Sequence, residues 1–516
     1  PGVPAYLEVR RGLIAFRDVG QDVLRDADYV VVGSGAGGAA AAVALARGGA
    51  TVAIIEAGPW RDPNAYPETA YGAMRDMMDD WGNSMAMGQA LWPIVQARLV
   101  GGTTVVNSAI CVRTPGDIFR QWRDEHGVGG DAYAERMWKY QDLIERDLCV
   151  EEVPDRAMGR SNQLALIGDQ RANLGGHVMR RYVKGCEGSG QCLQGCKNLR
   201  KQSTNLNYVP ETMERRGMVL SCAPADKILL DGKRAIGVTG HFQHPTTKKQ
   251  GARFTVRARR GVFVAASVTH SPVLLIRSGI KSRQLGNFFR AHPGTGIFGV
   301  YDEAVDMNVG ATQGWASTKF RSDPGMKLET LAIPLELVAS RLSGGGTQLM
   351  ERLTKYRHLA MWVHACRAES VGTVRPTAFG LSSKPMIRYG LNRADMERFR
   401  EGMKTVARMH FEAGAKEIIP GIQGLPYSLT PDQLHVMDSA PLDPRAYVAI
   451  LSHLFGGAVM GKNPRTSVCD ENGRVHGYDG LYIGDASAIP TNLGVNPQHT
   501  IMALAMNAAE RALETR

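Results

Sequence analysis

Apolar residues near the N-terminus form two short runs on either side of a stretch of small residues. Residues 28–32 (Asp-Tyr-Val-Val-Val) and 51–55 (Thr-Val-Ala-Ile-Ile) are almost continuously apolar, which is typical of strands buried on both faces of a parallel sheet. Residues 39–47 between them are mostly alanine and favour a helix. The pattern therefore predicts a βαβ unit.

The turn between the first strand and the helix has the spacing Gly-x-Gly-x-x-Gly at Gly33, Gly35 and Gly38. In such a turn the first glycine permits a sharp bend, the second lets a pyrophosphate approach the backbone, and the third lets helix and strand pack closely. Glu56 ends the second strand, where a carboxylate accepts hydrogen bonds from ribose hydroxyls. The unit predicts a dinucleotide site, but the motif alone does not separate FAD from NAD.

A second patterned block lies near the C-terminus. Residues 481–483 form a short apolar run that Gly484 and Asp485 interrupt, and residues 500–513 have the spacing of an apolar helix. Asn496 and Pro497 precede this helix. We therefore expect a helix N-terminus and free backbone N–H groups beside an anionic ligand.

Size and composition are those of an ordinary soluble protein, with 516 residues, of which 44% are hydrophobic and 22% charged. The length exceeds what one core usually supports, so we expect two domains with a cofactor cleft between them. No apolar run is long enough to span a membrane, and residues 1–21 do not have the pattern of a signal peptide. We expect a cytoplasmic protein, or a periplasmic one if it is exported with a partner or a removed leader.

The net charge is +11, but the Lys and Arg clusters are short. This distribution favours a solvated basic surface and gives no reason to expect a nucleic-acid partner. The alternative is that the surface binds an acidic electron-transfer protein, such as a cytochrome or a small subunit.

Further segments resemble the glucose–methanol–choline (GMC) family of oxidoreductases. Residues 100–107 (Val-Gly-Gly-Thr-Thr-Val-Val-Asn) resemble its flavin-contacting stretch, and residues 262–267 with 271–280 resemble its second signature. Residues 286–293 resemble its Gly-x-Asn-x-x-x-His-Pro element, although the asparagine lies one place early. The family's C-terminal block is matched by residues 453–461, 481–487 and 496–497.

The resemblance implies an α/β fold in which a Rossmann-like FAD-binding domain adjoins a substrate domain with an antiparallel sheet. We expect the FAD-binding domain to be discontinuous and to comprise residues 25–114, 205–282 and 447–516. The substrate domain would then comprise residues 115–204 and 283–446.

The family also implies the chemistry, in which an alcohol passes a hydride to flavin N5 and becomes an aldehyde or ketone. The family's catalytic histidine falls on His453, which we assign as general base because an imidazole titrates near neutrality. Asn496 is its expected partner on the substrate oxygen, whereas His292 is expected to be structural. Electrons would pass to an acceptor other than NAD. The alternatives are an oxygen-using alcohol oxidase and a lyase or decarboxylase on the same fold.

The expected FAD is not covalently bound, because Val105 and Val106 occupy the region where some relatives carry a flavin-linked histidine. The residues expected to contact it are Gly33, Gly35, Ala36, Gly38, Glu56, Ala57, Gly101, Gly102, Thr103, Asn107, Ala225, Ala266, Gly484, Asp485, Asn496, Pro497 and His499.

Three of the eight cysteines are clustered, at Cys186, Cys192 and Cys196. Their spacing, C-x5-C-x3-C, resembles that of bacterial FAD glucose and fructose dehydrogenases, and three thiolates can hold a [3Fe–4S] cluster. Against this, Lys197 stands where ferredoxins commonly have proline. The alternative is a tight loop with a disulfide or free thiols. Zinc is less favoured, because no fourth ligand lies at a suitable spacing.

Overall fold

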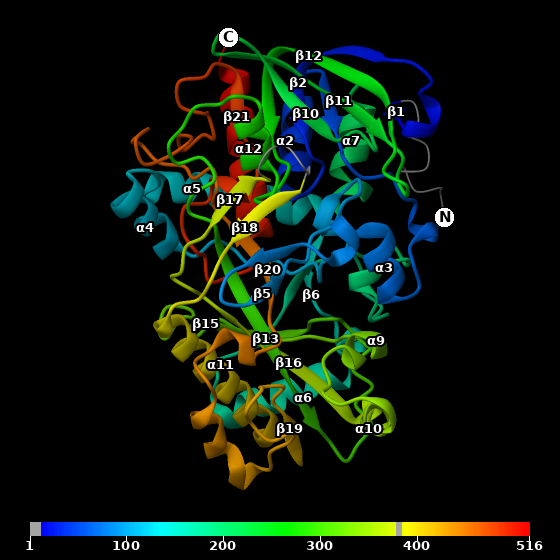
Figure 1. The fold of residues 1–516 in the computed structure, drawn as a ribbon, viewed down its shortest axis with the longest axis vertical. Helices are drawn as coiled ribbons and strands as arrows, with labels where there is room; N and C mark the ends of the chain where they lie inside the picture. Colours follow the sequence, from blue (N-terminus) through cyan, green and yellow to red (C-terminus); the bar gives the residue numbers. More distant parts are fainter. Residues whose placement is uncertain (1–11, 378–383, 516) are drawn as a thin grey trace.

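The computed structural model describes residues 12–377 and 384–515. Figure 1 shows a mostly parallel sheet in the upper half of the molecule and an antiparallel sheet in the lower half, with β13 (Arg290–Val300) running through the lower half from the junction. The predicted α/β architecture with a second, antiparallel sheet is confirmed.

The upper sheet has eight strands within the described residues, in the order β1-β9-β3-β2-β12-β11-β10, and β21 pairs with β12. All pairs are parallel except β12 with β11 and β11 with β10. The predicted βαβ unit is β2, α2 (Ala36–Arg47) and β3. The strands are β1 (Leu13–Ile14), β2 (Val23–Val32), β3 (Val52–Ile55), β9 (Met218–Leu220), β10 (Ala225–Asp231), β11 (Arg234–Gln243), β12 (Gln250–Val264) and β21 (Leu481–Ile483).

Helix α2 lies in the interior of the upper half, and residues 37–46 of it are buried. Its small side chains let α12 (Gln498–Glu514) and α7 (Tyr208–Glu214) pack closely against it. The C-terminal helix therefore covers the same unit that carries the glycine turn (Figure 1).

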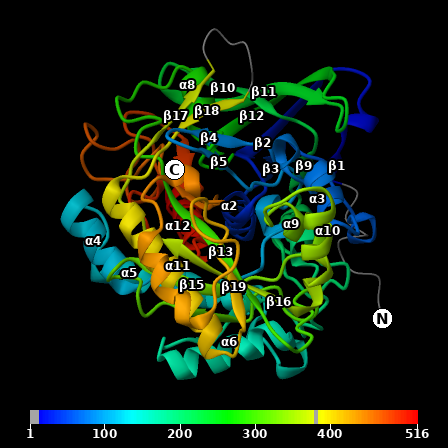
Figure 2. The ribbon, with the colours of Figure 1, turned by 60° about the horizontal axis from the view of Figure 1, so that its bottom comes forward.

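The lower sheet is antiparallel, in the order β19-β13-β16-β15-β14-β7, and β20 pairs with the other end of β13. Helix α11 (Arg393–Glu412) packs on this sheet and against α6 (Gly159–Ala172), as Figure 2 shows. The remaining strands are β7 (His177–Val178), β14 (Trp315–Ser317), β15 (Met326–Thr330), β16 (Leu359–Cys366), β19 (Glu417–Ile419) and β20 (Ile450–Phe455).

Strand β20 belongs to the third segment predicted for the FAD-binding domain, yet it pairs with β13 of the lower sheet. The exact division into domains therefore stays a prediction.

The smaller elements are α3 (Ala70–Met77), α4 (Gly116–His126), α5 (Asp131–Asp147), α8 (Ser271–Arg277), α9 (Leu335–Ala339), α10 (Gly346–Thr354), β4 (Met85–Met87), β5 (Leu91–Pro93), β6 (Val150–Glu152), β8 (Arg180–Tyr182), β17 (Thr373–Pro376) and β18 (Pro385–Arg388). Among the residues that are described, no helix is long and apolar enough to cross a membrane.

Trp362 of β16 fixes α11 to the lower sheet. Its ring stacks on the ring of His410 with centroids 3.8 Å apart, and both side chains are buried. His410 Nε2 lies 3.1 Å from the carbonyl oxygen of Ile297, and burial lowers the pKa of His410 to about 3. The helix is therefore held by a neutral ring stack and a hydrogen bond to the next strand.

We expect Trp362→Ala to destabilise the protein by about 3–5 kcal/mol, because it removes a fully buried indole and leaves a cavity. The urea midpoint of the variant should fall accordingly. Met350→Ala, on the exposed side of α10, is the control and should leave the midpoint nearly unchanged, since the Met350 side chain is 64% exposed. Equal midpoints for the two variants would contradict this account of the core.

Candidate active site

Two glycine turns from distant parts of the chain meet at the N-terminus of α2. Gly35 caps the helix without a side-chain hydrogen bond, so the first N–H groups of α2 are available to a ligand. Gly102 faces it so closely that a Cβ at Gly102 would lie 2.8 Å from the Cα of Gly35. The arrangement is a backbone cradle suited to a pyrophosphate.

Ser34 ties this cradle to Glu56. Its hydroxyl donates to Glu56 Oε2 at 2.6 Å and accepts the N–H of Gly101 at 2.9 Å. The N–H of Gly58 donates to the other carboxylate oxygen of Glu56 at 2.8 Å. The sequence analysis missed Ser34, whose only signal is its place between the first two glycines of the motif.

A cavity of about 1120 Å³ runs from this cradle to His453. The predicted residues that line it are Gly33, Gly35, Ala36, Glu56, Ala57, Gly102, Thr103, Asn107, Ala225, Ala266, His453, Asp485, Asn496 and Pro497. Gly38, Gly101, Gly484 and His499 are outside the lining. Gly38 instead packs on the turn, where an added Cβ would lie 2.0 Å from the carbonyl oxygen of Gly33.

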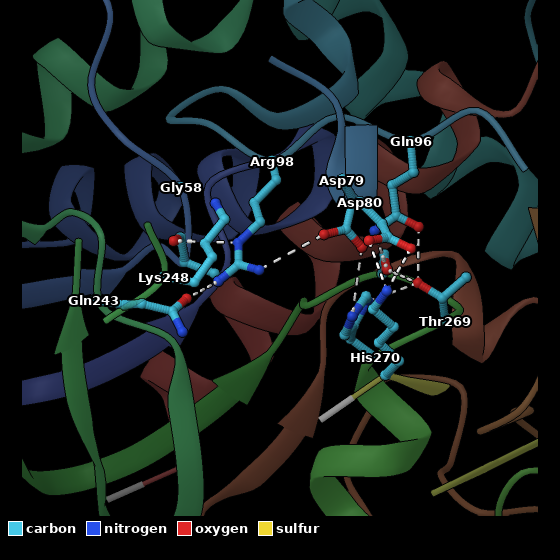
Figure 3. A network of polar contacts seen from close by, with 12 residues as sticks. Gly58, Asp79, Asp80, Gln96, Arg98, Gln243, Lys248, Thr269 and His270 are labelled. Atoms are coloured by element: carbon cyan, nitrogen blue, oxygen red, sulfur yellow. Dashed lines mark hydrogen bonds and ion pairs between the residues drawn. The ribbon is translucent and has the colours of Figure 1, made fainter. Parts of the chain in front are cut away.

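The cavity is also lined by residues of a polar network that the sequence analysis did not predict (Figure 3). Asp79 lies between the guanidinium of Arg98, whose Nη1 is 3.7 Å away, and the ring of His270, whose Nε2 is 3.6 Å away. Burial lowers the pKa of His270. Arg98 also donates to Gln243 Oε1 at 2.8 Å. Only the fold brings these residues together, because they come from three separate segments.

His453 and Asn496 meet at the other end of the cavity. His453 lies on β20 and Asn496 just before α12, and Asn496 Nδ2 is 3.3 Å from His453 Nε2. The register of β13 with β20 places His292 opposite His453, with their Nδ1 atoms 3.1 Å apart. The pair expected from sequence is therefore assembled, and His292, expected to be structural, contacts it directly.

Lys327 and Glu329 of β15 complete this site, and the sequence analysis missed both. Lys327 Nζ donates to Glu329 Oε1 and to Asn496 Oδ1. Both side chains are buried although charged, and Glu329 lines the cavity. In the sequence they alternate with Met326 and Leu328, a pattern that ordinarily indicates a strand with one solvated face.

Burial keeps the histidines of the site neutral. It lowers the pKa of His453 to about 4, while Glu329 acts to raise that pKa and Lys327 acts to lower it. Burial likewise holds the pKa of His292 well below its ordinary value, and His453 adds to this effect. At neutral pH His453 is therefore an uncharged imidazole that can accept a proton.

Comparisons with known proteins point to one family. The N-terminal part of the GMC oxidoreductase family matches residues 27–294, and its C-terminal part matches residues 368–505. A GMC-type oxidoreductase of Mycobacterium tuberculosis is 32% identical over 493 residues, which cover 94% of this chain and 76% of that protein.

The chain belongs to the GMC oxidoreductase family. A long-chain-alcohol oxidase of Arabidopsis thaliana is 26% identical over 98% of the chain and 69% of its own length. A formate oxidase of Aspergillus oryzae, whose FAD modification has been studied, shares the fold, with a TM-score of 0.72 and 17% identity over 95% of this chain and 98% of its own. This GMC oxidoreductase is an FAD-dependent enzyme that acts on CH–OH donors.

The site residues fit FAD. The glycine cradle would hold the pyrophosphate, Glu56 the ribose and the Ala225 segment the adenine, while His453 and Asn496 lie at the flavin end. The C-terminal block is tied to this groove, because Asp485 accepts the N–H of Ser267 at 2.8 Å. The groove therefore joins the glycine cradle and Glu56 to His453 and Asn496.

The cysteine loop does not fit a [3Fe–4S] cluster. Cys186, Cys192 and Cys196 are buried together, but the guanidinium of Arg181 lies among them, 2.9 Å from Cys192 Sγ and 3.9 Å from Cys186 Sγ. Burial raises the pKa of Cys192, but Arg181 and Lys201 outweigh it and lower this pKa to about 7. The guanidinium already pairs with two of the three thiols that a cluster would need as ligands.

His499 lies behind the flavin end and outside the cavity. Its Nε2 is 3.3 Å from Glu145 Oε1. Potential metal-ligand atoms of His499, Glu145 and Cys111 all lie within 4.8 Å of one another. Glu145 is already bound by Arg113 and Arg180, each at 2.7 Å. These two guanidinium groups neutralise the carboxylate, so this cluster is structural and does not favour a metal ion.

We expect Gly102→Ala to raise the dissociation constant for FAD at least about tenfold, which corresponds to about 1.4 kcal/mol. The new Cβ would meet the backbone of Gly35, and Gly102 has a φ of +53° that disfavours other residues. FAD titration followed by protein fluorescence measures the effect. Gly20→Ala is the matched control, since an added Cβ there meets nothing within 4 Å. Equal affinities in both variants would remove the cradle assignment.

We also expect the purified protein to contain no iron in proportion to protein, and to show only flavin bands in its visible spectrum. The reason is the buried guanidinium among the three thiols. Metal analysis and acid-labile sulfide determination after anaerobic purification measure this. Three irons per chain would contradict the contacts of Arg181.

Proposed function

We propose that this GMC oxidoreductase oxidises an alcohol with His453 as the general base and Asn496 as the hydrogen-bond donor to the substrate oxygen. The observation that carries the proposal is the 3.3 Å approach of Asn496 Nδ2 to His453 Nε2 in the wall of the cofactor cavity. Bound FAD supplies the hydride acceptor. Every other role falls to side chains of the chain itself.

The substrate alcohol loses one proton and one hydride in the proposed reaction. The O–H proton passes to Nε2 of His453, and the C–H hydrogen leaves with its electron pair, so the alcohol becomes an aldehyde or ketone. The low pKa of His453 supports this role, because the imidazole is unprotonated before the reaction. Glu329 favours the imidazolium that forms, while Asn496 holds the oxygen.

We propose an alcohol with an apolar body as the substrate. The cavity wall beyond the catalytic pair is formed largely by aliphatic and thioether side chains, which recognise carbon chains or rings rather than sugars. The relative named as a long-chain-alcohol oxidase supports this class. The wall residues are Leu331, Ile333, Leu337, Met361, Val363 and Ile450.

The flavin is proposed to be dissociable and to pass its electrons to an acceptor other than NAD. Val105 and Val106 are both buried, and neither offers a nucleophile for a covalent bond to the flavin. An acidic electron-transfer protein or dioxygen are the two acceptors to compare, and turnover with each distinguishes a dehydrogenase from an oxidase.

His453→Ala should slow anaerobic reduction of the flavin by a primary long-chain alcohol by about 10²–10⁴-fold, because the hydroxyl proton loses its acceptor. The absorbance of bound FAD in a stopped-flow instrument measures this rate. The wild-type rate should be constant near neutral pH and fall as the pH approaches about 4, where His453 becomes protonated.

His435→Ala, at an exposed position, is the control and should reduce at the wild-type rate. The base assignment fails if His453→Ala still binds FAD and reduces it normally. A sugar alcohol that reduces the flavin faster than the long-chain alcohol would overturn the substrate class alone.

A further inference from the structure

The ion pair of Lys327 and Glu329 is buried against the catalytic pair, and the proposed reaction gives Lys327 no role of its own. The side chains are only 3% and 6% exposed. Removing two charges from water costs free energy that an apolar pair of the same size would not cost. Stability therefore does not explain the pair, whereas its contact with Asn496 does.

Lys327 determines which way the Asn496 amide points. An ammonium group has only donors, so the Asn496 atom that faces Lys327 has to be the acceptor Oδ1. The amide Nδ2 is then turned toward His453, 3.3 Å from its Nε2. In this orientation Asn496 presents N–H groups to Nε2 of His453, which favours the tautomer with a lone pair on Nε2. The substrate hydroxyl has to replace Asn496 at that lone pair when it binds.

The orientation of Asn496 also affects which ring nitrogen carries the proton in His453 and in His292. When Nε2 of His453 accepts, its own proton lies on Nδ1, which donates to Nδ1 of His292 at 3.1 Å. His292 then keeps its proton on Nε2; the side chain of Asn492 also forms a hydrogen bond with this histidine. The N–H of Gly494 lies 2.9 Å from Nε2 of His292 and can donate to it. This contact favours the opposite pair of tautomers, in which the proton of His453 is on its Nε2 and the base has no free lone pair.

We propose that Lys327 is a positioning residue that selects the base-competent tautomer of His453 through Asn496, and that Glu329 balances its charge. The proposal rests on the proposed function, because it takes His453 as the base. The groups that face His453 are Lys327 and Glu329 from β15 and His292 from β13. Loss of the Lys327 charge should raise the pKa of His453, and loss of the Glu329 charge should lower it.

Three variants test the proposal: Lys327→Met, Glu329→Gln and the double variant, in which both charges are replaced by neutral groups of similar shape. The flavin reduction rate of the FAD-loaded enzyme is measured anaerobically against pH. Lys327→Met should lower the rate at the plateau at least about tenfold and move the inflection up by about one pH unit. Glu329→Gln should move the inflection down. The double variant should return the inflection to the wild-type pH but keep the loss in rate, because nothing then orients the amide.

A second readout uses the FAD-free protein and does not involve activity. Lys327→Met leaves a buried carboxylate whose pKa rises on folding, so its thermal midpoint should be lower at pH 8 than at pH 6. Glu329→Gln leaves a buried ammonium whose pKa falls on folding, so its midpoint should be lower at pH 6 than at pH 8. The double variant should show neither trend, and it remains testable where Lys327→Met alone does not fold.

The proposal is overturned if the double variant reduces the flavin at the wild-type rate. It is also overturned if the single variants move the inflection in the same direction. If the wild-type pH profile has no inflection, or if its inflection persists in His453→Ala, His453 is not the base. That result is a failure of the proposed function.

Discussion

The antiparallel pairing of β13 with β20 is the constraint on which the active site depends. It sets His292 opposite His453, the proposed base, so the two rings lie side by side. Asn496 approaches from the loop before α12, and Lys327 approaches from β15. The proposed base on β20 is thus surrounded by residues from three other segments of the chain.

The glycine cradle plays the corresponding part at the other end of the cofactor groove. Gly35 and Gly102 approach backbone to backbone, and Ser34 links them to Glu56 through short hydrogen bonds. One cavity contains both this cradle and His453, so a single cofactor can contact both.

The local motifs could be predicted from sequence, because glycine turns, buried strands and the Asn-Pro start of a helix follow from the residues themselves. Lys327 and Glu329 could not, since their alternation with Met326 and Leu328 has the same pattern as a strand with a solvated face. Only the packing of β15 below Asn496 turns that polar face inward. The residues of Figure 3 were missed for the same reason, because Asp79 and His270 meet only in the folded chain.

In the cysteine loop, the sequence spacing suggests an iron–sulfur cluster that the packing of the side chains does not support. The spacing of Cys186, Cys192 and Cys196 is that of a possible cluster site, but it contains no information about Arg181, which lies among the thiols. Lys201 adds a second buried cation, whose Nζ donates to the carbonyl oxygens of Cys192 and Asn107 at 2.8 and 2.9 Å. The loop therefore supports the flavin end of the groove through its backbone.

A crystal structure of the FAD complex tests the central claim most directly. The account predicts that the isoalloxazine ring lies in contact with His453 and Asn496, that Glu56 binds the ribose, and that Lys327 still bonds to Asn496 Oδ1. A ring bound away from His453, or a Lys327 side chain that has left Asn496, would contradict it.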